Sequence, residues 1–218
     1  MYLSIIKKRT EIRSLEEKVA FAKMIAETRR KYGDLSNEQN VHRMICDMAG
    51  GCKRKTQNLL YIKIGKDGHM FYIQSDCKLD KDAVRGCGYG IAAVKDEGEF
   101  LKLIENGDRL ILRAKLAPVK REIRTHTLCS LAQSPKEKME WLMRLAENNG
   151  FQFVGTLQES IMEHIRWRKN EQGHSWTNAF LYTAEIEVVD KDAFIRAVHY
   201  GVGRYKAYGC GMLMIAER

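Results

Sequence analysis

The end of the chain, GVGRYKAYGCGMLMIAER, gathers glycines and cations as phosphate-binding segments do. A dinucleotide fingerprint needs a third glycine where this chain has Lys206, and the Lys-Ser or Lys-Thr of a P-loop is missing. We expect instead a flexible, basic and aromatic ledge that a nucleic-acid backbone can approach closely. Gly201 also fits a helix end, and Gly209 or Gly211 fits the turn into a last strand. The candidate binding residues of this ledge are Gly201, Gly203, Arg204, Lys206, Gly209 and Gly211.

Three short basic clusters are further candidates for phosphate contacts. Arg166 and Arg168 flank Trp167 in a strand pattern, so alternation puts both on one face. Together with Lys169 they are the first candidates to stabilise charge on a reacting phosphate without a metal. The other two clusters are Lys120, Arg121 and Arg124, and Lys53, Arg54 and Lys55. Each cluster could also be a solvated loop without a binding role. No single cluster therefore indicates RNA binding, and the summed positive charge of the chain is what favours RNA as a partner.

The overall charge favours a polyanionic partner. Lys and Arg exceed Asp and Glu by 9 in this chain of 218 residues, and 44% of the residues are hydrophobic. Such a protein has ample core, and it suits nucleic acid better than an acidic or neutral small substrate. No run of about 18 apolar residues occurs, and the first charges follow the first apolar residues, unlike a signal peptide. We therefore expect a cytoplasmic protein with no membrane partner.

The cysteines do not suggest a metal centre. All 6 lie far apart, without a C-x-x-C pair or a histidine at zinc-ligand spacing. In a reducing compartment such thiols stay free. We predict no disulfide, no metal and no cofactor.

Hydrophobic spacing predicts the elements of the first half. The expected strands are 2–8, 59–64, 69–75 and 99–104. Helical spacing covers 11–31 and 36–48, and the second helix starts at a capping box of Ser36 and Gln39. The secondary structure of residues 78–98 is ambiguous, because a helix near Lys81 and a loop at the stretch GCGYG are both possible.

The second half repeats the same order. Its expected strands are 109–116, 151–157, 179–189 and 212–216, and its expected helices are 134–149 and 193–198. Ser134 and Glu137 form a capping box with a proline at the first helical position. A basic segment and a turn at Gly173 separate the two middle strands.

Each half therefore runs strand, helix, strand, strand, helix, strand, with an additional helix in the first half. This order is typical of the ferredoxin-like (RRM-like) unit, in which an antiparallel sheet carries helices on one face. We predict an α+β fold of two such domains in tandem, at residues 1–105 and 108–218. Ferredoxin-like domains occur in proteins with many different functions, so this fold alone does not indicate the function of the chain.

Four stretches, in order along the chain, resemble one known family. They are MYLS, NVHRMICDMAGG, DRLILRAKLAPVKR and the Gly-rich ending, which is the most specific of the four. Together they resemble the CasE-type CRISPR RNA-processing endoribonucleases of type I-E Cascade. The correspondence covers nearly the whole chain, with residues 11–34 as an insertion.

This resemblance implies a partner and a reaction. Members bind the hairpin of a CRISPR repeat transcript and cut at the 3′ base of its stem without a metal. The products carry a 2′,3′-cyclic phosphate and a 5′-hydroxyl. Many members then stay on the guide RNA, so the implied partners are the CRISPR repeat RNA hairpin and other type I-E Cascade subunits.

The resemblance also places the catalytic histidine at His42. Imidazole suits proton transfer because its pKa lies near the working pH. On helical geometry His42 lies at the edge of an apolar stripe, one turn from Glu38 and from Cys46. Some relatives carry a tyrosine where this chain has Gln39, so the second proton-transfer role has no assigned residue. Tyr32 and the lysines are the alternatives for it.

Two other functions remain as alternatives. The chain could be an RNA-holding Cascade subunit with little or no cleavage, because the second catalytic role is open. It could also be a basic ferredoxin-like enzyme acting on a small anionic metabolite. An RNA complex should weaken steeply as salt rises, which separates it from that last alternative.

Overall fold

The computed structural model describes residues 1–10, 14–51, 58–65, 68–160, 162–170 and 173–217. The chain forms two compact units, Met1–Glu99 and Phe100–Arg218. Residues 105–108, where the two predicted domains meet, lie within the second unit. Within the described ranges, no helix combines the length and the apolar character needed to span a membrane.

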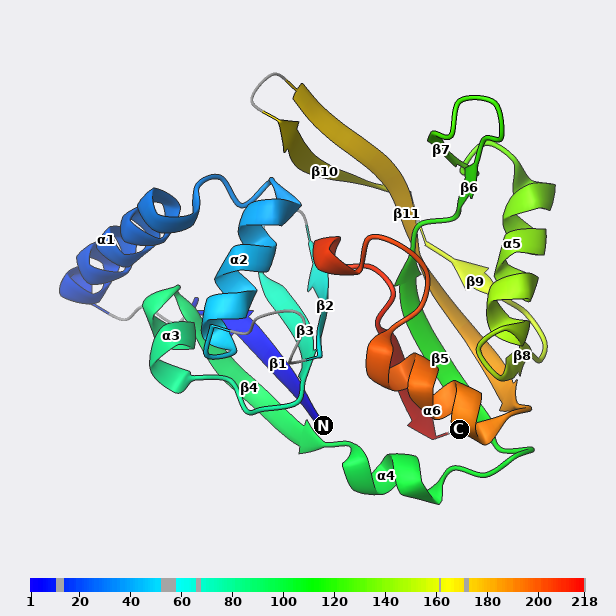
Figure 1. Cartoon of the computed structure of the whole chain (residues 1–218). Coiled ribbons are helices and arrows are strands. Elements are labelled where there is room, and N and C mark those ends of the chain that lie inside the picture. Colours follow the sequence, from blue (N-terminus) through cyan, green and yellow to red (C-terminus); the bar gives the residue numbers. More distant parts are fainter. Residues whose placement is uncertain (11–13, 52–57, 66–67, 161, 171–172, 218) are drawn as a thin grey trace. The chain divides into compact units, whose positions relative to one another are not determined.

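The first unit contains a four-stranded antiparallel sheet with the strand order β2-β3-β1-β4 (Figure 1). Its strands are β1 (Tyr2–Lys8), β2 (Leu59–Ile64), β3 (Met70–Ser75) and β4 (Tyr89–Asp96). Its helices are α1 (Leu15–Tyr32), α2 (Glu38–Met48) and α3 (Lys81–Gly86), and α4 (Gly98–Leu103) crosses into the second unit. The first and third strands lie in the middle of the sheet, as the ferredoxin-like unit requires.

The core of the first unit lies between α2 and the sheet. Four apolar residues of α2 recur at helical spacing and form one face of the helix. They are Val41, Met44, Ile45 and Met48, each with 0% of its surface exposed. These residues pack with side chains of β1, β2, β3 and α3 in a single cluster. The predicted second helix and its apolar stripe are confirmed.

The start of α2 differs from the prediction. Asn37 is the N-cap, and its side chain accepts a hydrogen bond from the backbone nitrogen of Gln39. The hydroxyl of Ser36 instead donates to Asp34 Oδ2 at 2.6 Å. Asparagine caps a helix as well as serine does, so Asn37, which directly precedes the first helical residue, serves as the N-cap. The predicted capping box of Ser36 and Gln39 is therefore wrong.

The last part of the first unit also differs from the prediction. A helix begins at Lys81, which confirms one of the two alternatives for this segment, and β4 starts inside the GCGYG stretch. Because β4 closes the sheet, the strand expected at 99–104 is wrong, and most of that segment is α4. Leu101 and Ile104 are buried there, and their spacing of three residues suits one helical face.

The second unit contains a larger antiparallel sheet with the strand order β10-β11-β5-β12, in which β8 and β9 also pair with β11. Its main strands are β5 (Arg109–Leu116), β10 (Glu163–Asn170), β11 (Gly173–Val188) and β12 (Leu213–Glu217). The short strands are β6 (Val119–Arg121), β7 (Leu128–Ser130), β8 (Phe151–Phe153) and β9 (Gln158–Glu159). The helices are α5 (Pro135–Glu147), α6 (Lys191–Tyr200) and the 3₁₀ turn η1 (Lys206–Tyr208).

Strand β11 belongs to two different parts of this unit. Its residues 180–187 pair with β5 on one side, while β8 and β9 pair with it on the other. Its residues 173–179 pair with β10 alone among the described strands. In Figure 1 this part of β11 and β10 extend as a two-stranded ribbon beyond the rest of the sheet.

Helices α5 and α6 supply the helical part of the second core. Phe194 of α6 packs on Phe151 of β8 with ring centroids 5.8 Å apart, and Leu142 of α5 is buried. Pro135 opens α5 as predicted, but the Ser134 side chain makes no capping hydrogen bond, so that capping box is wrong. Both units thus have ferredoxin-like (RRM-like) topology, and the predicted tandem α+β fold is confirmed.

Candidate functional site

His42 lies on α2 between the buried stripe and solvent, and it is partly exposed. Its Nε2 lies 3.6 Å from Cys46 Sγ, one turn further along the helix. Its ring stacks on that of Tyr61 in β2, with centroids 6.3 Å apart and an interplanar angle of 21°. Tyr61 is fully buried, so the core holds one face of the imidazole. This is the anchored but accessible position that a proton-transfer group needs.

Glu38 lies one turn before His42 and is a buried carboxylate. Lys63 of β2 forms an ion pair with it, and the two side chains are only 10% (Lys63) and 6% (Glu38) exposed. A buried charge needs a partner of opposite charge, so the Lys63 ammonium group serves to neutralise the Glu38 carboxylate. The pair fixes this turn of α2 against β2.

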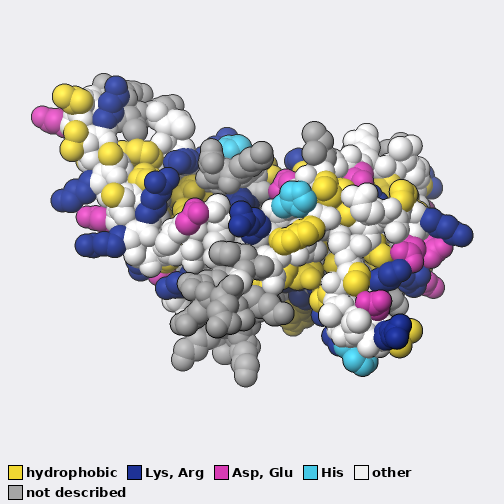
Figure 2. Space-filling model, turned by 90° about the horizontal axis from the view of Figure 1, so that it is seen from above, with side chains coloured by type: hydrophobic (Ala, Val, Ile, Leu, Met, Phe, Trp, Pro, Cys, Tyr) yellow, Lys and Arg dark blue, Asp and Glu magenta, His cyan; other side chains and the backbone are white. Residues whose placement is uncertain are grey.

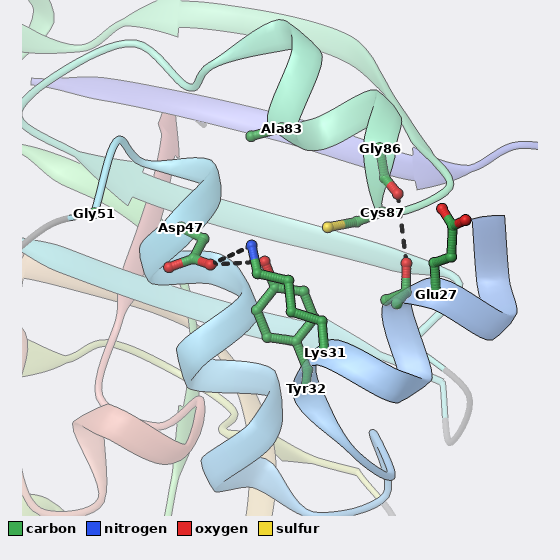
Figure 3. A pocket seen from close by; sticks show the side chains of 9 residues that line it. Glu27, Lys31, Tyr32, Asp47, Gly51, Ala83, Gly86 and Cys87 are labelled. Carbon is green, nitrogen blue, oxygen red and sulfur yellow. Dashed lines mark hydrogen bonds and ion pairs between the residues drawn. The ribbon is translucent and has the colours of Figure 1, made fainter.

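A cavity of about 430 Å³ opens between α1, α2 and α3 (Figure 3). In it, Asp47 accepts a hydrogen bond from Tyr32 Oη at 2.8 Å, and Lys31 Nζ lies 2.8 Å from the same carboxylate oxygen. The Cys87 thiol lines the cavity as well. The C-terminal end of α1 is thereby anchored on α2.

These contacts determine the charges in the cavity. Burial raises the pKa of Tyr32 to about 12. The hydrogen bond with Asp47 raises the pKa of Lys31, and the same bond lowers the pKa of Asp47. At neutral pH the group is therefore a neutral tyrosine, a lysine cation and a carboxylate. Tyr32 already donates its hydroxyl proton to Asp47, which makes it a poor choice for the second proton-transfer role.

The sequence did not single out Arg43, which follows His42 directly. A hollow of about 290 Å³ is lined by Arg43 and Cys46 of α2 together with Lys31 and Tyr32 of α1. Cys46 is also the contact of His42. Arg43 and Lys31 thus line a hollow that Cys46, the contact of His42, also borders, and the sequence signal for Arg43 is its place next to the histidine.

Strand β10 carries the basic residues that alternate around Trp167. Arg166 is exposed and lies opposite Trp176 of β11, whose side chain is 61% exposed. Arg168 and Lys169 continue the strand, and their side chains lie outside the described residues. The strand is as predicted, and the contact of these residues with RNA stays a prediction.

The Gly-rich ending packs on β10 through aromatic rings. The ring centroid of Trp167 lies 5.0 Å from that of Tyr208 and 5.1 Å from that of Tyr205. The three rings are partly buried against a small core that includes the buried Cys210. The two tyrosines therefore anchor this segment, which is packed and not the flexible ledge expected from the sequence.

Lys206 and Gly201 end helix α6. Gly201 has a φ of 68°, and Lys206 Nζ donates to the carbonyl oxygens of Tyr200 at 3.0 Å and of Gly201 at 3.2 Å. A cation at this position compensates the carbonyl end of a helix. Lys206 therefore has a structural role in addition to the RNA contact predicted for it.

The remaining glycines shape the loop. Gly209 and Gly211 are buried with positive φ, and the carbonyl of Gly211 accepts a hydrogen bond from the backbone nitrogen of Val202 at 2.8 Å. Of the candidate residues in this segment, Gly203 and Arg204 are the exposed ones. A direct contact with RNA is thus open to Arg204, while the buried glycines act through the shape of the loop.

The other two basic clusters have different settings. Lys120 and Arg121 lie on β6, which pairs with β7, so part of the expected loop is a short hairpin. Lys120 pairs with Glu137 of α5 at 2.5 Å, and Arg121 and Arg124 are exposed. The third cluster, Lys53, Arg54 and Lys55, lies outside the described residues.

Charge is distributed over the surface. On the face shown in Figure 2, Lys and Arg side chains are spread over the molecule and do not form one patch. In the part of the chain that the structure describes, no three His, Cys, Asp or Glu side chains are grouped to hold a metal ion, and the five described cysteines form no disulfide.

Two known proteins illustrate what this chain is similar to. The CRISPR-associated endoribonuclease Cse3 of Thermus thermophilus is 31% identical over 137 residues, which are 58% of this chain and 64% of that relative. The match therefore spans less than two thirds of the relative's length. Cas6e from Escherichia coli K-12 has a TM-score of 0.65 at 17% identity, over 100% of both chains.

A further solved structure, CRISPR endoribonuclease Cse3 bound to a 19-nucleotide RNA, has a TM-score of 0.79 at 22% identity. It covers 99% of this chain and 100% of that one, so the whole fold is shared. The family described as CRISPR associated protein matches residues 1–217. Since this match takes in nearly every residue and both ferredoxin-like units, the chain belongs to the CRISPR associated protein family.

Proposed function

We propose that this protein is a metal-independent endoribonuclease that binds the hairpin of a CRISPR repeat transcript and cuts at the 3′ base of the stem. The observation that carries the proposal is the 31% identity to Cse3, which is named an endoribonuclease. Solved structures with the same fold include Cse3 with bound RNA and a CRISPR RNA-guided surveillance complex. After the cut, the protein stays on the guide RNA with the other subunits of type I-E Cascade.

The reaction needs two proton transfers and supplies its own nucleophile. The 2′-oxygen loses its proton and bonds to phosphorus, the bond to the 5′-oxygen breaks, and that oxygen takes up a proton. The products are a 2′,3′-cyclic phosphate and a 5′-hydroxyl. His42 carries out one of the two transfers, because an imidazole titrates near neutral pH and this one is partly exposed on a fixed helix. Arg166 and the other basic residues stabilise the charge that develops on the phosphate.

Tyr32 serves the fold more than the chemistry. We expect Tyr32→Phe to lower the free energy of unfolding by about 1 to 2 kcal/mol, because the hydrogen bond to the charged Asp47 is lost. The cleavage rate should stay within about twofold of wild type, since no proton-transfer group is removed. Urea unfolding and single-turnover cleavage measure the two effects. A folded Tyr32→Phe protein that no longer cuts would instead make Tyr32 the second proton-transfer group.

The proposed function is tested with a labelled repeat hairpin from the source genome, in EDTA and at several salt concentrations. We expect one cut at the 3′ base of the stem, and an affinity that falls by about 100-fold to 10,000-fold between about 50 and 200 mM salt. Tight binding without product would select the RNA-holding subunit. If the protein does not bind RNA, or if its activity does not depend on salt concentration, the result would favour the alternative function, an enzyme that acts on a small anionic metabolite.

We also place this activity in the cytoplasm. Precursor transcripts are made there, and the five described cysteines form no disulfide, which is consistent with a reducing compartment.

A further inference from the structure

A second cavity, of about 610 Å³, lies in the second unit between α5 and the start of the Gly-rich loop. Trp141 and Arg144 of helix α5 and its C-cap residue Asn148 line the cavity, and their spacing of i, i+3 and i+7 puts them on one face. The loop contributes Gly203 and Arg204. The reaction at His42 uses none of Trp141, Arg144 and Asn148, and the sequence did not single them out.

The two arginines give this cavity a positive charge. Arg144 and Arg204 are both exposed, and neither forms an ion pair with any residue that the structure describes. The carbonyl end of α6 does not need Arg204, because Lys206 already caps it. The carbonyl end of α5 is worth about half a negative charge, which offsets only part of two guanidinium charges. The cavity therefore attracts an anion.

An aromatic ring forms one wall. The Trp141 indole is partly buried, and a Cβ atom placed on Gly203 would lie 3.7 Å from its Cη2 atom. The loop backbone is thus close enough to hold the ring in position. Asn148 is exposed at the end of α5, where its amide offers both a donor and an acceptor. Leu145 and Val119, which are buried, and Asn149 complete the lining.

We propose that this cavity binds one unpaired nucleotide of the RNA, with its base stacked on Trp141 and its phosphate held by Arg144 and Arg204. The inference rests on the proposed function. An aromatic face beside guanidinium groups and an amide is the set of groups that proteins use for single-stranded RNA. A nucleotide within the stem does not fit, because its neighbours already cover both faces of its base. The volume is in the range of small-ligand pockets.

The test compares two RNAs with the full-length protein. One is the complete repeat RNA, and the other is its stem alone, annealed from two strands without unpaired nucleotides. We expect Trp141→Leu and Arg144→Ala each to weaken binding of the complete repeat by about tenfold, the value of one stacked base or one phosphate contact. Neither variant should change the affinity for the bare stem by more than about twofold. Arg144 is exposed on a helix, so Arg144→Ala keeps the fold even if Trp141→Leu does not.

The matched control is Arg196→Ala, which removes an exposed arginine of α6 that does not line the cavity. It changes only the summed charge and should affect both RNAs equally. If Arg144→Ala behaves like this control, or if it weakens both RNAs to the same extent, the nucleotide site is refuted. If wild type binds neither RNA, the proposed function itself fails, so the two failures are distinguishable.

Discussion

Replacing His42 with alanine lowers the rate of RNA cleavage by about 100-fold to 10,000-fold and leaves hairpin affinity within about twofold. The reason is that a positioned imidazole moves a proton in the transition state, while the basic residues proposed to bind the stem are unchanged. His42 is partly exposed and lies outside the fully buried stripe of α2, so its removal should cost little stability. Single-turnover cleavage in EDTA, with binding measured in parallel, gives both numbers.

Two further proteins make this result specific. His69→Ala removes an exposed histidine of the same unit, near the start of β3, and should cut at the wild-type rate. His42→Gln keeps most of the side-chain volume and should lose as much activity as His42→Ala, because an amide does not titrate. A His42→Ala protein that still cuts at the wild-type rate would remove this residue from the mechanism.

Gly211→Ala is expected to destabilise the second unit by about 3 kcal/mol or more, beyond the cost of its backbone conformation alone. A Cβ atom at this position would lie 2.2 Å from the carbonyl oxygen of Val202, and Gly211 has a φ of +84°. Its backbone nitrogen donates to the carbonyl of Lys115 in β5 at 2.8 Å, so the segment cannot move away without losing that bond. The free energy of urea unfolding measures the loss.

Gly107→Ala is the matched control for this clash. Gly107 also belongs to the second unit and has a φ of +91°, but nothing lies within 4 Å of an added Cβ atom. It should cost only about 1 kcal/mol, the value of the left-handed conformation. Equal losses in the two variants would mean that the Gly-rich loop absorbs the clash, and that its close approach to Val202 does not contribute to stability.

Elements whose apolar residues fit only one period were predictable from the sequence, whereas a segment that fits both periods was not. The bounds of β1, β2 and β5 agree with the predicted strands, and the stripe of α2 appeared where its spacing indicated. Residues 99–104 were mistaken for a strand, because a six-residue apolar segment offers little evidence for either period. The cap at Ser36 failed because Asn37 takes the N-cap position and the Ser36 hydroxyl bonds to Asp34. Ser134 does hold the N-cap position of α5, but its side chain makes no capping hydrogen bond.

The candidate sites were predictable only as single residues. His42 could be placed at the border of its stripe, because helical geometry relates residues that are close in sequence. The stack of Trp167 on Tyr205 and Tyr208 joins segments that are far apart in the chain, and no local pattern predicts it. The same holds for the cavity that α5 shares with Arg204.

The divided pairing of β11 has an evolutionary consequence. Its residues 180–187 are held on both sides by strands of the sheet, while residues 173–179 pair only with β10 among the described strands. Mutations in the outer ribbon therefore disturb few bonds of the inner sheet. The ribbon carries Arg166 and Trp176, so these positions can diverge between related proteins while the framework that keeps the protein folded is retained.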